Sequence, residues 1–366
     1  MNRNISLSLS GGGLRATLFG LGSLWRLNDA GLLHDLGQVT SVSGGSITAG
    51  VLAARWRDLE ILQGRSPGFE RLIADPVRDY CRQGLSYGVV VRGLLDPRST
   101  AAERYETQYA DRLFGKATLA DLPDPGTDSA PEFVFYATSQ QVGTGVQLSR
   151  AKIANDVLGE YQEPRLTLAR AVAASSAFPP LLSPVFIETN PDAWRGGGSR
   201  PSWQLAALRA RLALSDGGVY DNLGLDSALG HSGMVLVSDA GSAFPPLERP
   251  LRFWPLQVIR VGAIARAHVE HLQRTAVVSC LEAGTLEGAY WGLQTNIDDF
   301  GLSDPMTRDS DATRAMAQTP LMRRVADEAL QGRIINWAYA LTDAALRRDL
   351  RTNLPKGSWP VPAYPL

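Results

Sequence analysis

Three glycine-rich turns in this 366-residue sequence carry groups that could do hydrolytic chemistry. They are Gly11-Gly12-Gly13-Leu14-Arg15, Ser41-Val42-Ser43-Gly44-Gly45 and Asp216-Gly217-Gly218. Each turn follows a segment whose residue pattern predicts a β-strand. Because the carboxyl ends of parallel strands share one edge of a sheet, the three turns could meet in space.

The first turn offers backbone N–H groups. Glycines without a Cβ let the N–H groups of Gly11, Gly12 and Gly13 approach a ligand, and the helix predicted to follow points its positive end to the same place. Such a turn can hold a phosphate or stabilise the oxyanion of a tetrahedral intermediate. It lacks the Lys-Ser/Thr ending of a P-loop and the spacing of a dinucleotide site. A purely structural tight turn fits the same residues.

The second turn has the features of a nucleophile elbow, in which a serine lies on a sharp turn between a strand and a helix. An elbow needs small residues two positions either side of the serine, so that the backbones do not collide. Gly45 satisfies this requirement downstream of Ser43, and Ser41 stands upstream where glycine is usual. Ser43 is therefore a candidate nucleophile, with a plain Ser/Gly turn as the alternative.

The third turn can supply the base that a hydrolytic serine needs. Asp216 lies at a predicted strand end, where its carboxylate could act on Ser43 directly. Asp239 also ends a predicted strand and is the alternative base. We expect Asp221 or Asn222 to cap the helix that follows the third turn.

The four histidines do not suggest a catalytic triad. None of them ends a predicted strand after Ser43 and an acid, as the Ser…Asp…His order of α/β-hydrolases requires; they are His34, His231, His268 and His271. His268, Glu270 and His271 could suggest a metal site, but their place on one late helix favours a solvated helix face. We expect neither a metal nor a cofactor.

The elements that position these turns are clearest at the N-terminus. Residues Ile5 to Ser10 alternate apolar and polar, which predicts a strand, and apolar residues recur at helical spacing from Leu14 to Asn28. A second strand, Gln38 to Val42, is followed by a second helix, Ser46 to Trp56. Two strand–turn–helix units in succession indicate a parallel sheet with helices on its faces.

The rest of the chain is less regular. The pattern predicts helices at Thr100 to Phe114 (opened by a capping box), Leu166 to Ala177, Leu223 to Leu229, Ala263 to about Tyr290 and, in two or three pieces, Thr319 to Arg351. It predicts strands at Glu132 to Ser139, Gly145 to Ser149, Leu212 to Ser215 and Met234 to Ser238, and a long polar loop from Glu188 to Trp203. The tail after Leu354 is expected to be irregular.

Composition limits the partners and the location. A net charge of -1 provides no field that would hold nucleic acid. The first ten residues lack the apolar run of a signal peptide, and no stretch of about 18 apolar residues could span a bilayer. We therefore expect a cytoplasmic protein.

Together the three turns resemble the patatin-like phospholipase family in its bacterial, stand-alone form. The matching residues are Gly11 to Arg15, Ser43 with Gly45, Asp216-Gly217-Gly218, Phe133 to Ser139 and Ala174 to Pro179, and the resemblance spans about residues 4–241. It implies a three-layer α/β/α fold with a mainly parallel central sheet. Residues 1–245 would form the catalytic core, and 246–366 a mainly helical region packed on it in the same globule.

The resemblance also implies site roles. Asp216 would activate Ser43 as a Ser–Asp dyad that forms an acyl-enzyme. Gly11, Gly12, Gly13 and Gly44 would form the oxyanion hole, and Arg15 would support that loop or contact a lipid phosphate.

The function implied is hydrolysis of membrane glycerophospholipids of the phospholipase A type, by a protein attached peripherally to the inner face of the membrane. Apolar surface for that contact is expected in Glu188 to Trp203 or in Ser86 to Leu95. Similar stand-alone proteins include bacterial lipases that degrade their own cell's membrane when a small-molecule or protein signal activates them. The alternatives are an esterase or thioesterase acting on soluble acyl donors, and a non-catalytic binding module.

Overall fold

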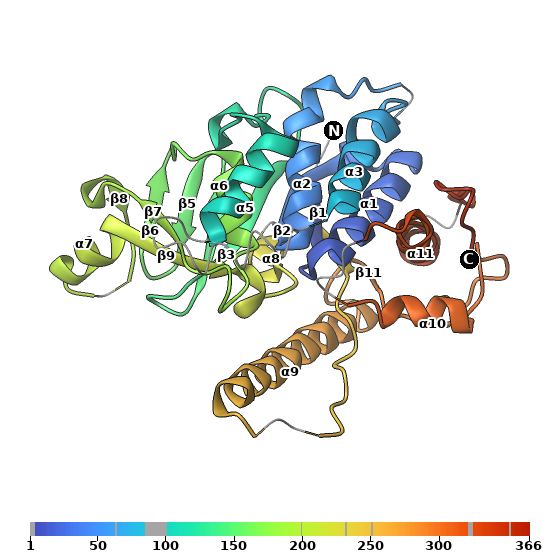
Figure 1. Cartoon of the computed structure of the whole chain (residues 1–366). Helices are drawn as coiled ribbons and strands as arrows, with labels where there is room; N and C mark the ends of the chain where they lie inside the picture. The colour runs from blue at the N-terminus through green and yellow to red at the C-terminus, as the bar shows by residue number, and fades with distance from the viewer. Residues whose placement is uncertain are drawn as a thin grey trace.

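The computed structural model describes residues 4–62, 64–84, 101–198, 200–230, 233–249, 252–320, 325–350 and 353–366. Over these residues the chain forms one 11-stranded sheet with helices on both faces (Figure 1). The strands are β1 (Ile5–Leu9), β2 (Leu36–Val42), β3 (Glu132–Ser139), β4 (Gly145–Ser149), β5 (Lys152–Asn155), β6 (Gly159–Gln162), β7 (Val185–Glu188), β8 (Trp194–Arg195), β9 (Arg211–Asp216), β10 (Met234–Asp239) and β11 (Gly288–Gly292). The helices are α1 (Gly13–Asp29), α2 (Gly44–Arg55), α3 (Asp75–Gln83), α5 (Ala101–Tyr109), α6 (Leu168–Ser175), α7 (Ser202–Ala210), α8 (Leu225–Gly230), α9 (Trp254–Glu282), α10 (Asp311–Ala317) and α11 (Glu328–Ala345).

The part of the sheet that carries the three turns is parallel. Strands β11, β10, β1, β2 and β3 lie side by side in that order, and each neighbouring pair is parallel. Beyond β3 the sheet continues through β4, β5, β6 and β8 with antiparallel pairs. The predicted α/β/α architecture with a mainly parallel sheet is therefore confirmed, with an antiparallel extension.

Two apolar layers cover the faces of the parallel strands. On one face, Leu7 and Leu9 of β1 belong to the main core with residues of α1, α2 and α11. On the other, Val235 and Val237 of β10 form a smaller cluster with residues of α8 and with Val277 of α9. The alternation of side chains along a strand sends successive residues of β10 to opposite layers. None of the helices in the described ranges is both long and apolar enough to cross a membrane.

The C-terminal third contributes to both the sheet and the core. Strand β11 adds to the edge of the sheet beside β10, although we predicted that residues up to about Tyr290 would be helical. That prediction is wrong because α9 ends at Glu282 and Gly284 follows with a φ of +68°. Helix α11 packs along α1, where Arg26 and Asp343 form a buried ion pair with a 2.8 Å contact.

Several other predictions from local pattern need correction. Helix α9 begins at Trp254, nine residues before the predicted start at Ala263, and α10 was not predicted. The segment from Glu188 to Trp203 is not one loop, because Trp194 and Arg195 pair with β6 and α7 begins at Ser202. The segment Ser86 to Leu95, the predicted cap at Thr100 and His231 lie outside the described residues.

The direction of β9 differs from the prediction, and it decides how the site is built. We expected the strand before Asp216 to run parallel to the others, but β9 pairs antiparallel with β3, through Ala137 opposite Asp216. A short strand pattern does not encode direction, which here is set by the antiparallel pairing of β9 with both β3 and β7.

Candidate active site

Ser43 lies on a strained turn between β2 and α2. Its backbone has φ 51° and ψ −117°, a conformation that costs energy for any residue other than glycine. The turn leaves no space beside it, since a Cβ at Gly44 would lie 2.0 Å from the carbonyl oxygen of Gly13 and one at Gly45 would lie 2.4 Å from that of Leu9. The serine is therefore held directly against the first glycine turn.

A second serine holds the elbow in place. Ser175, at the end of α6, accepts a hydrogen bond through its Oγ from the backbone N–H of Ser43 at 3.1 Å. The Ser175 hydroxyl donates to the carbonyl oxygen of Tyr136 at 2.7 Å, and Ser46 Oγ lies 2.8 Å from Ser175 Oγ. These contacts tie the strained turn to β3 and α6. Sequence analysis did not single out Ser175, although it lies in the Ala174 to Pro179 stretch.

Ser41, which stands where an elbow usually has glycine, is accommodated by hydrogen bonds. Its hydroxyl donates to the carbonyl oxygen of Val134 on β3 at 3.2 Å and accepts from Ser46 Oγ at 3.0 Å. The side chain is 1% exposed, so both of these partners satisfy a buried polar group. The serine in this position therefore connects β2, β3 and α2.

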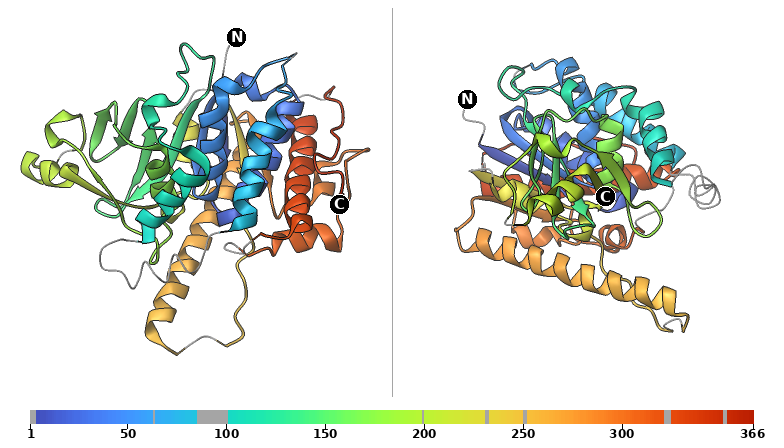
Figure 2. Two further views of the ribbon diagram at one scale, coloured as in Figure 1. Left: turned by 45° about the horizontal axis from the view of Figure 1, so that its top comes forward. Right: turned by 90° about the vertical axis from the view of Figure 1, so that its left-hand side faces the viewer.

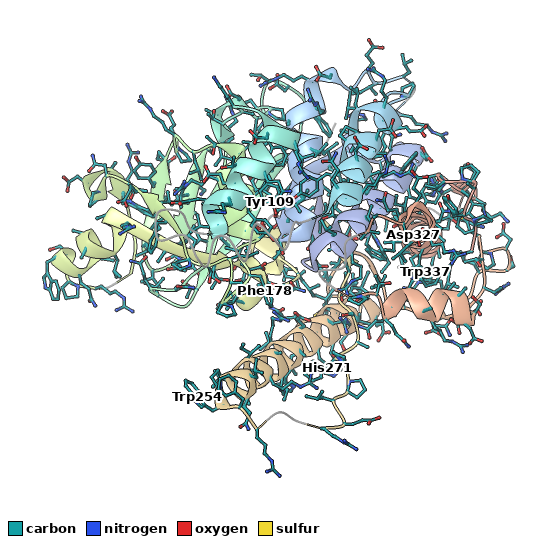
Figure 3. All side chains as sticks on the ribbon, in the orientation of Figure 1. Tyr109, Phe178, Trp254, His271, Asp327 and Trp337 are labelled. Carbon is teal, nitrogen blue, oxygen red and sulfur yellow. The ribbon has the colours of Figure 1, made fainter. Side chains whose placement is uncertain are left out.

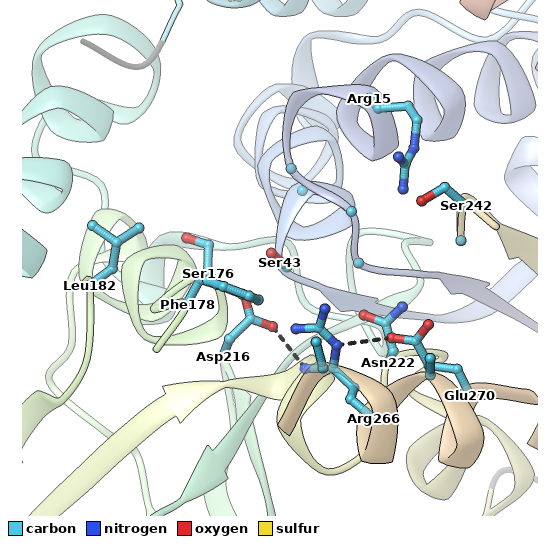
Figure 4. A pocket seen from close by; sticks show the side chains of 18 of the residues that line it. Arg15, Ser43, Ser176, Phe178, Leu182, Asp216, Asn222, Ser242, Arg266 and Glu270 are labelled. Atoms are coloured by element: carbon cyan, nitrogen blue, oxygen red, sulfur yellow. Dashed lines mark hydrogen bonds and ion pairs between the residues drawn. The ribbon is translucent and has the colours of Figure 1, made fainter. Parts of the chain in front are cut away.

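Asp216 reaches Ser43 because two strands end head to head. Along the edge of β3 that faces away from β4, β2 ends opposite Tyr136, and β9, running the other way, ends opposite Ala137. The residue after Val42 and the last residue of β9 therefore meet. Figure 4 shows the Ser43 and Asp216 side chains close together in the cavity.

The surroundings of Asp216 favour a carboxylate that can take up a proton near neutral pH. Burial raises the pKa of this carboxyl to about 6, while hydrogen bonds with the Ser43 hydroxyl and the Gly218 N–H and the charge of Arg266 act to lower the pKa. The side chain is 3% exposed, and its Oδ1 accepts from the Gly218 N–H at 2.8 Å. A base with a pKa in this range is suited to general base catalysis.

Some backbone N–H groups around the first glycine turn are already hydrogen-bonded within the protein, and others are not. The Gly11 N–H donates to the carbonyl oxygen of Asn222 at 3.0 Å, so this glycine, which we expected in the oxyanion hole, has its N–H already engaged. Gly12 and Gly13 have φ values of 146° and 58°. Among the residues described, no acceptor is found for the backbone N–H groups of Gly12, Gly13 or Gly44. These three N–H groups remain available to a ligand.

Arg15 links the glycine-rich turn to two other segments of the chain through hydrogen bonds. Its guanidinium is buried and donates to the carbonyl oxygens of Ala240 and Thr319. Burial lowers the pKa of this arginine to about 10, against the raising effect of Asp239 and Glu270. With these contacts Arg15 connects the turn to the end of β10 and to the chain before α11, and so the supporting role fits better than a phosphate contact.

Both carboxylate oxygens of Asp239, the alternative base, already accept hydrogen bonds from other groups. Its Oδ2 accepts from Arg274 Nε at 2.8 Å and from the Tyr290 hydroxyl at 2.7 Å, and its Oδ1 accepts from the Gly241 N–H at 2.7 Å. Asp239 does not line the cavity that contains Ser43. The geometry therefore favours Asp216 as the partner of Ser43.

Asn222 lies in the site, and the predicted helix cap is its neighbour Asp221. A Cβ on Gly11 would lie 2.3 Å from Asn222 Oδ1, and one on Gly218 would lie 2.4 Å from the same atom, so this amide fills the space between the first and third turns. The capping expectation holds for its neighbour Asp221, whose carboxylate accepts backbone N–H bonds from Leu223, Gly224 and Asp226. The sequence pattern does not distinguish the roles of these two adjacent residues.

The cavity over these residues has a volume of about 280 Å³ and is largely apolar. One wall consists of side chains from α5 and from the segment after α6, including Tyr105, Tyr109, Phe178 and Leu182. The opposite wall comes from the segment after β10 and from α9, through Phe244, Arg260, Ala263, Arg266, Ala267 and Glu270. Sequence analysis missed this second wall.

The three histidines in the described residues lie away from the cavity. His34 packs against the Trp56 ring with centroids 5.0 Å apart, and His268 and His271 are exposed on α9. No histidine in the described ranges lines the cavity. Within the same ranges, no group of three or more His, Cys, Asp or Glu side chains could hold a metal ion.

Two comparisons with known proteins return matches, one for the sequence family and one for the fold. Residues 7–229 match the sequence model of a family described as patatin-like phospholipase. A search of curated proteins finds no match.

Among solved structures, the fold is similar to human GIVD cytosolic phospholipase A2 in complex with methyl gamma-linolenyl fluorophosphonate, with a TM-score of 0.52, 15% identity, and coverage of 96% of this chain and 59% of the human chain. The same human enzyme with that inhibitor and terbium chloride gives a TM-score of 0.51 at 16% identity, over 96% and 59% of the two chains. At these identities the likeness concerns the fold alone, and this chain spans 59% of the length of the human protein.

Proposed function

Because the chain belongs to the patatin-like phospholipase family, we propose that it cleaves ester bonds of membrane glycerophospholipids, with Ser43 as nucleophile and Asp216 as base. Membership of the family supports lipid hydrolase activity. The observation that carries the finer assignment is a serine on a strained turn and a buried aspartate that line the same apolar cavity.

In the proposed acylation step, the Asp216 carboxylate takes the proton of the Ser43 hydroxyl as Ser43 Oγ attacks the ester carbonyl carbon. The carbonyl π-bond opens to give a tetrahedral oxyanion. As it collapses, the bond from carbon to the alcohol oxygen breaks, and the proton on Asp216 passes to the leaving lysophospholipid. Water then attacks the acyl-enzyme by the same route, which releases the fatty acid and restores Ser43.

The free N–H groups of Gly12 and Gly13, with that of Gly44, are the proposed donors to the oxyanion. They lie against the elbow and have no other acceptor in the described part of the chain. Loss of one such donor typically costs about 3–4 kcal/mol of transition-state stabilisation. Gly11 contributes space for Asn222 in this scheme, and Arg15 holds the turn.

The aromatic and aliphatic wall of the cavity suits the acyl chain. Tyr109 and Phe178 border the space beside Ser43, and the Tyr109 hydroxyl is turned to Ser176 Oγ at 3.0 Å. A cavity of about 280 Å³ encloses part of a long acyl chain. Activation by a signal, which the resemblance implied, stays a prediction.

The experiment is fatty-acid release from mixed phospholipid vesicles by the wild type, Ser43→Ala and Asp216→Asn. We expect both variants to lose activity by a factor of about 10⁴ or more. Ser176→Ala is the matched control, because Ser176 lines the same cavity but has a negative φ of −109°, unlike Ser43. Full activity of Asp216→Asn would overturn the base assignment and make Asp239 the next candidate. Activity on a soluble short-chain ester but none on vesicles would instead favour an esterase.

A further inference from the structure

Helix α9 carries partly buried charged side chains on the side that faces the protein and large exposed apolar side chains on the opposite side. Arg260, Arg266, Glu270 and Arg274 are spaced along one partly buried stripe, and three of the four line the cavity. Arg266 pairs with Glu270 across 3.5 Å, and Arg274 pairs with Asp239. A surface helix exposed only to water has the opposite arrangement, with its apolar stripe facing the core.

The outer face of α9, as used below, comprises Trp254, Val258, Val261, Ala265, Val269 and Leu272. Their spacing of i, i+4, i+7, i+11, i+15 and i+18 places them on one side of the helix. Trp254 is 72% exposed, and Val258 and Val261 are 63% and 64% exposed. Val277 is the single fully buried residue of α9. An apolar stripe of this length indicates an interaction surface.

The charge around the outer face fits lipid headgroups. From Phe253 to Leu281 the one acidic residue is Glu270, which belongs to the inward stripe. Exposed Glu248, Arg249 and Arg252 precede the helix with a net positive charge, and exposed His268 and His271 lie farther along it. The surface is therefore neutral to basic, which suits zwitterionic and anionic phospholipids.

The position of α9 connects this face to the cavity. The helix runs along the outside of the molecule, and its N-terminal end extends away from the sheet (Figure 2). Trp254 marks that free end (Figure 3). Tryptophan favours the boundary between headgroups and acyl chains. The cavity lies on the opposite side of α9 from the outer face. A membrane in contact with the outer face would therefore be one helix diameter, roughly 10 Å, from the cavity.

We propose that the outer face of α9 docks on a phospholipid bilayer, with the helix lying in the membrane interface and its inward stripe bordering the cavity. The proposal rests on the proposed function, which makes a bilayer lipid the substrate. A bilayer is favoured over a second copy of the chain because the apolar stripe, its basic start and the cavity wall all belong to one helix. Docking there brings lipid to the site.

The test measures flotation of the full-length Ser43→Ala protein with vesicles of phosphatidylcholine and phosphatidylglycerol, so that hydrolysis does not alter them. Val258→Glu with Val261→Glu should weaken binding by a factor of about ten or more, since two charges would enter the interface. The matched control is Ile61→Glu with Leu62→Glu, at residues 49% and 58% exposed on another surface. An unchanged unfolding midpoint confirms that each variant is folded.

A tryptophan pair gives a second comparison that does not introduce charge. Trp254→Ala should weaken vesicle binding, and Trp203→Ala should leave it unchanged. Trp203 is 74% exposed and lies in the segment from Glu188 to Trp203, which the sequence suggested for membrane contact. Binding of the α9 variants equal to that of the parent would overturn the proposal. Failure of the parent protein to bind vesicles would also overturn it. A third contradicting result would be a dimeric parent whose dimer is disrupted by the α9 substitutions while vesicle binding is unchanged.

The same proteins separate this proposal from the proposed function. If binding depends on α9 but the protein with Ser43 intact releases no fatty acid from the vesicles, docking stands and the proposed hydrolysis fails. If fatty acid is released equally by the parent and the α9 variants, hydrolysis stands and docking fails.

Discussion

Asparagine in place of Asp216 should stabilise the folded protein while it removes the activity. The carboxyl is 3% exposed, and no arginine or lysine forms an ion pair with it among the described residues. Burial raises its pKa from the ordinary value of 3.8 to about 6. Asparagine has nearly the same shape, and its Oδ1 can still accept from the Gly218 N–H.

The magnitude follows from the linkage between protonation and folding. Above pH 6 the carboxyl is ionised in both states, and the difference between 3.8 and about 6 makes the folded state less stable by about 3 kcal/mol. Below pH 3.8 the carboxyl is protonated in both states, so this penalty is absent and the full stability is present. That stability is lost as pH rises from 3.8 through 6. The advantage of Asp216→Asn should therefore be largest at pH 8, shrink between pH 6 and 4, and be absent below.

The assay is urea unfolding of both proteins at pH 4 and pH 8. Asp239→Asn is the matched control, because it leaves Arg274 without its carboxylate partner and should destabilise the protein by about 1–3 kcal/mol. An Asp216→Asn protein less stable than the wild type at pH 8, or one whose difference does not depend on pH, would refute the reasoning.

Three further predictions concern the elbow and its base. Gly44→Ala places a Cβ 2.0 Å from the Gly13 carbonyl oxygen, and fatty-acid release should fall by a factor of about 100 or more, with folding checked by circular dichroism. Ser175→Ala removes the acceptor of the Ser43 N–H and should lower the free energy of unfolding by about 1–2 kcal/mol and kcat about tenfold, with KM unchanged; an unchanged kcat would contradict this. Because Asp216 must be ionised, kcat/KM on a soluble ester should fall tenfold per pH unit below about 6, and a flat profile down to pH 5 would count against it as the base.

The sequence was most informative where local pattern alone decides structure. The first two strand–turn–helix units and the strand before Asp216 could be predicted because their apolar periodicity and glycines are local signals. The meeting of Ser43 and Asp216 was expected from parallel strand ends, whereas the structure brings them together through antiparallel β9. That direction depends on tertiary pairing, which a six-residue strand pattern does not contain.

The C-terminal third was less predictable for a different reason. Strand β11 is short and is flanked by glycines, so its pairing with β10 has no strong local signal. The apolar residues of α9 predict a helix, but their periodicity normally indicates burial, and here the stripe faces outward. Which face of such a helix contacts the protein is set by the ion pair between Arg274 and Asp239 and by the cavity wall.

The central claim, that Ser43 is a nucleophile activated by Asp216, is tested most directly by covalent labelling with a fluorophosphonate, followed by mass spectrometry of the peptides. The account predicts one labelled peptide, with the phosphonate on Ser43, no label there in Ser43→Ala, and labelling at least about 100-fold slower in Asp216→Asn. A label on another serine, or labelling of Asp216→Asn at the wild-type rate, would contradict it.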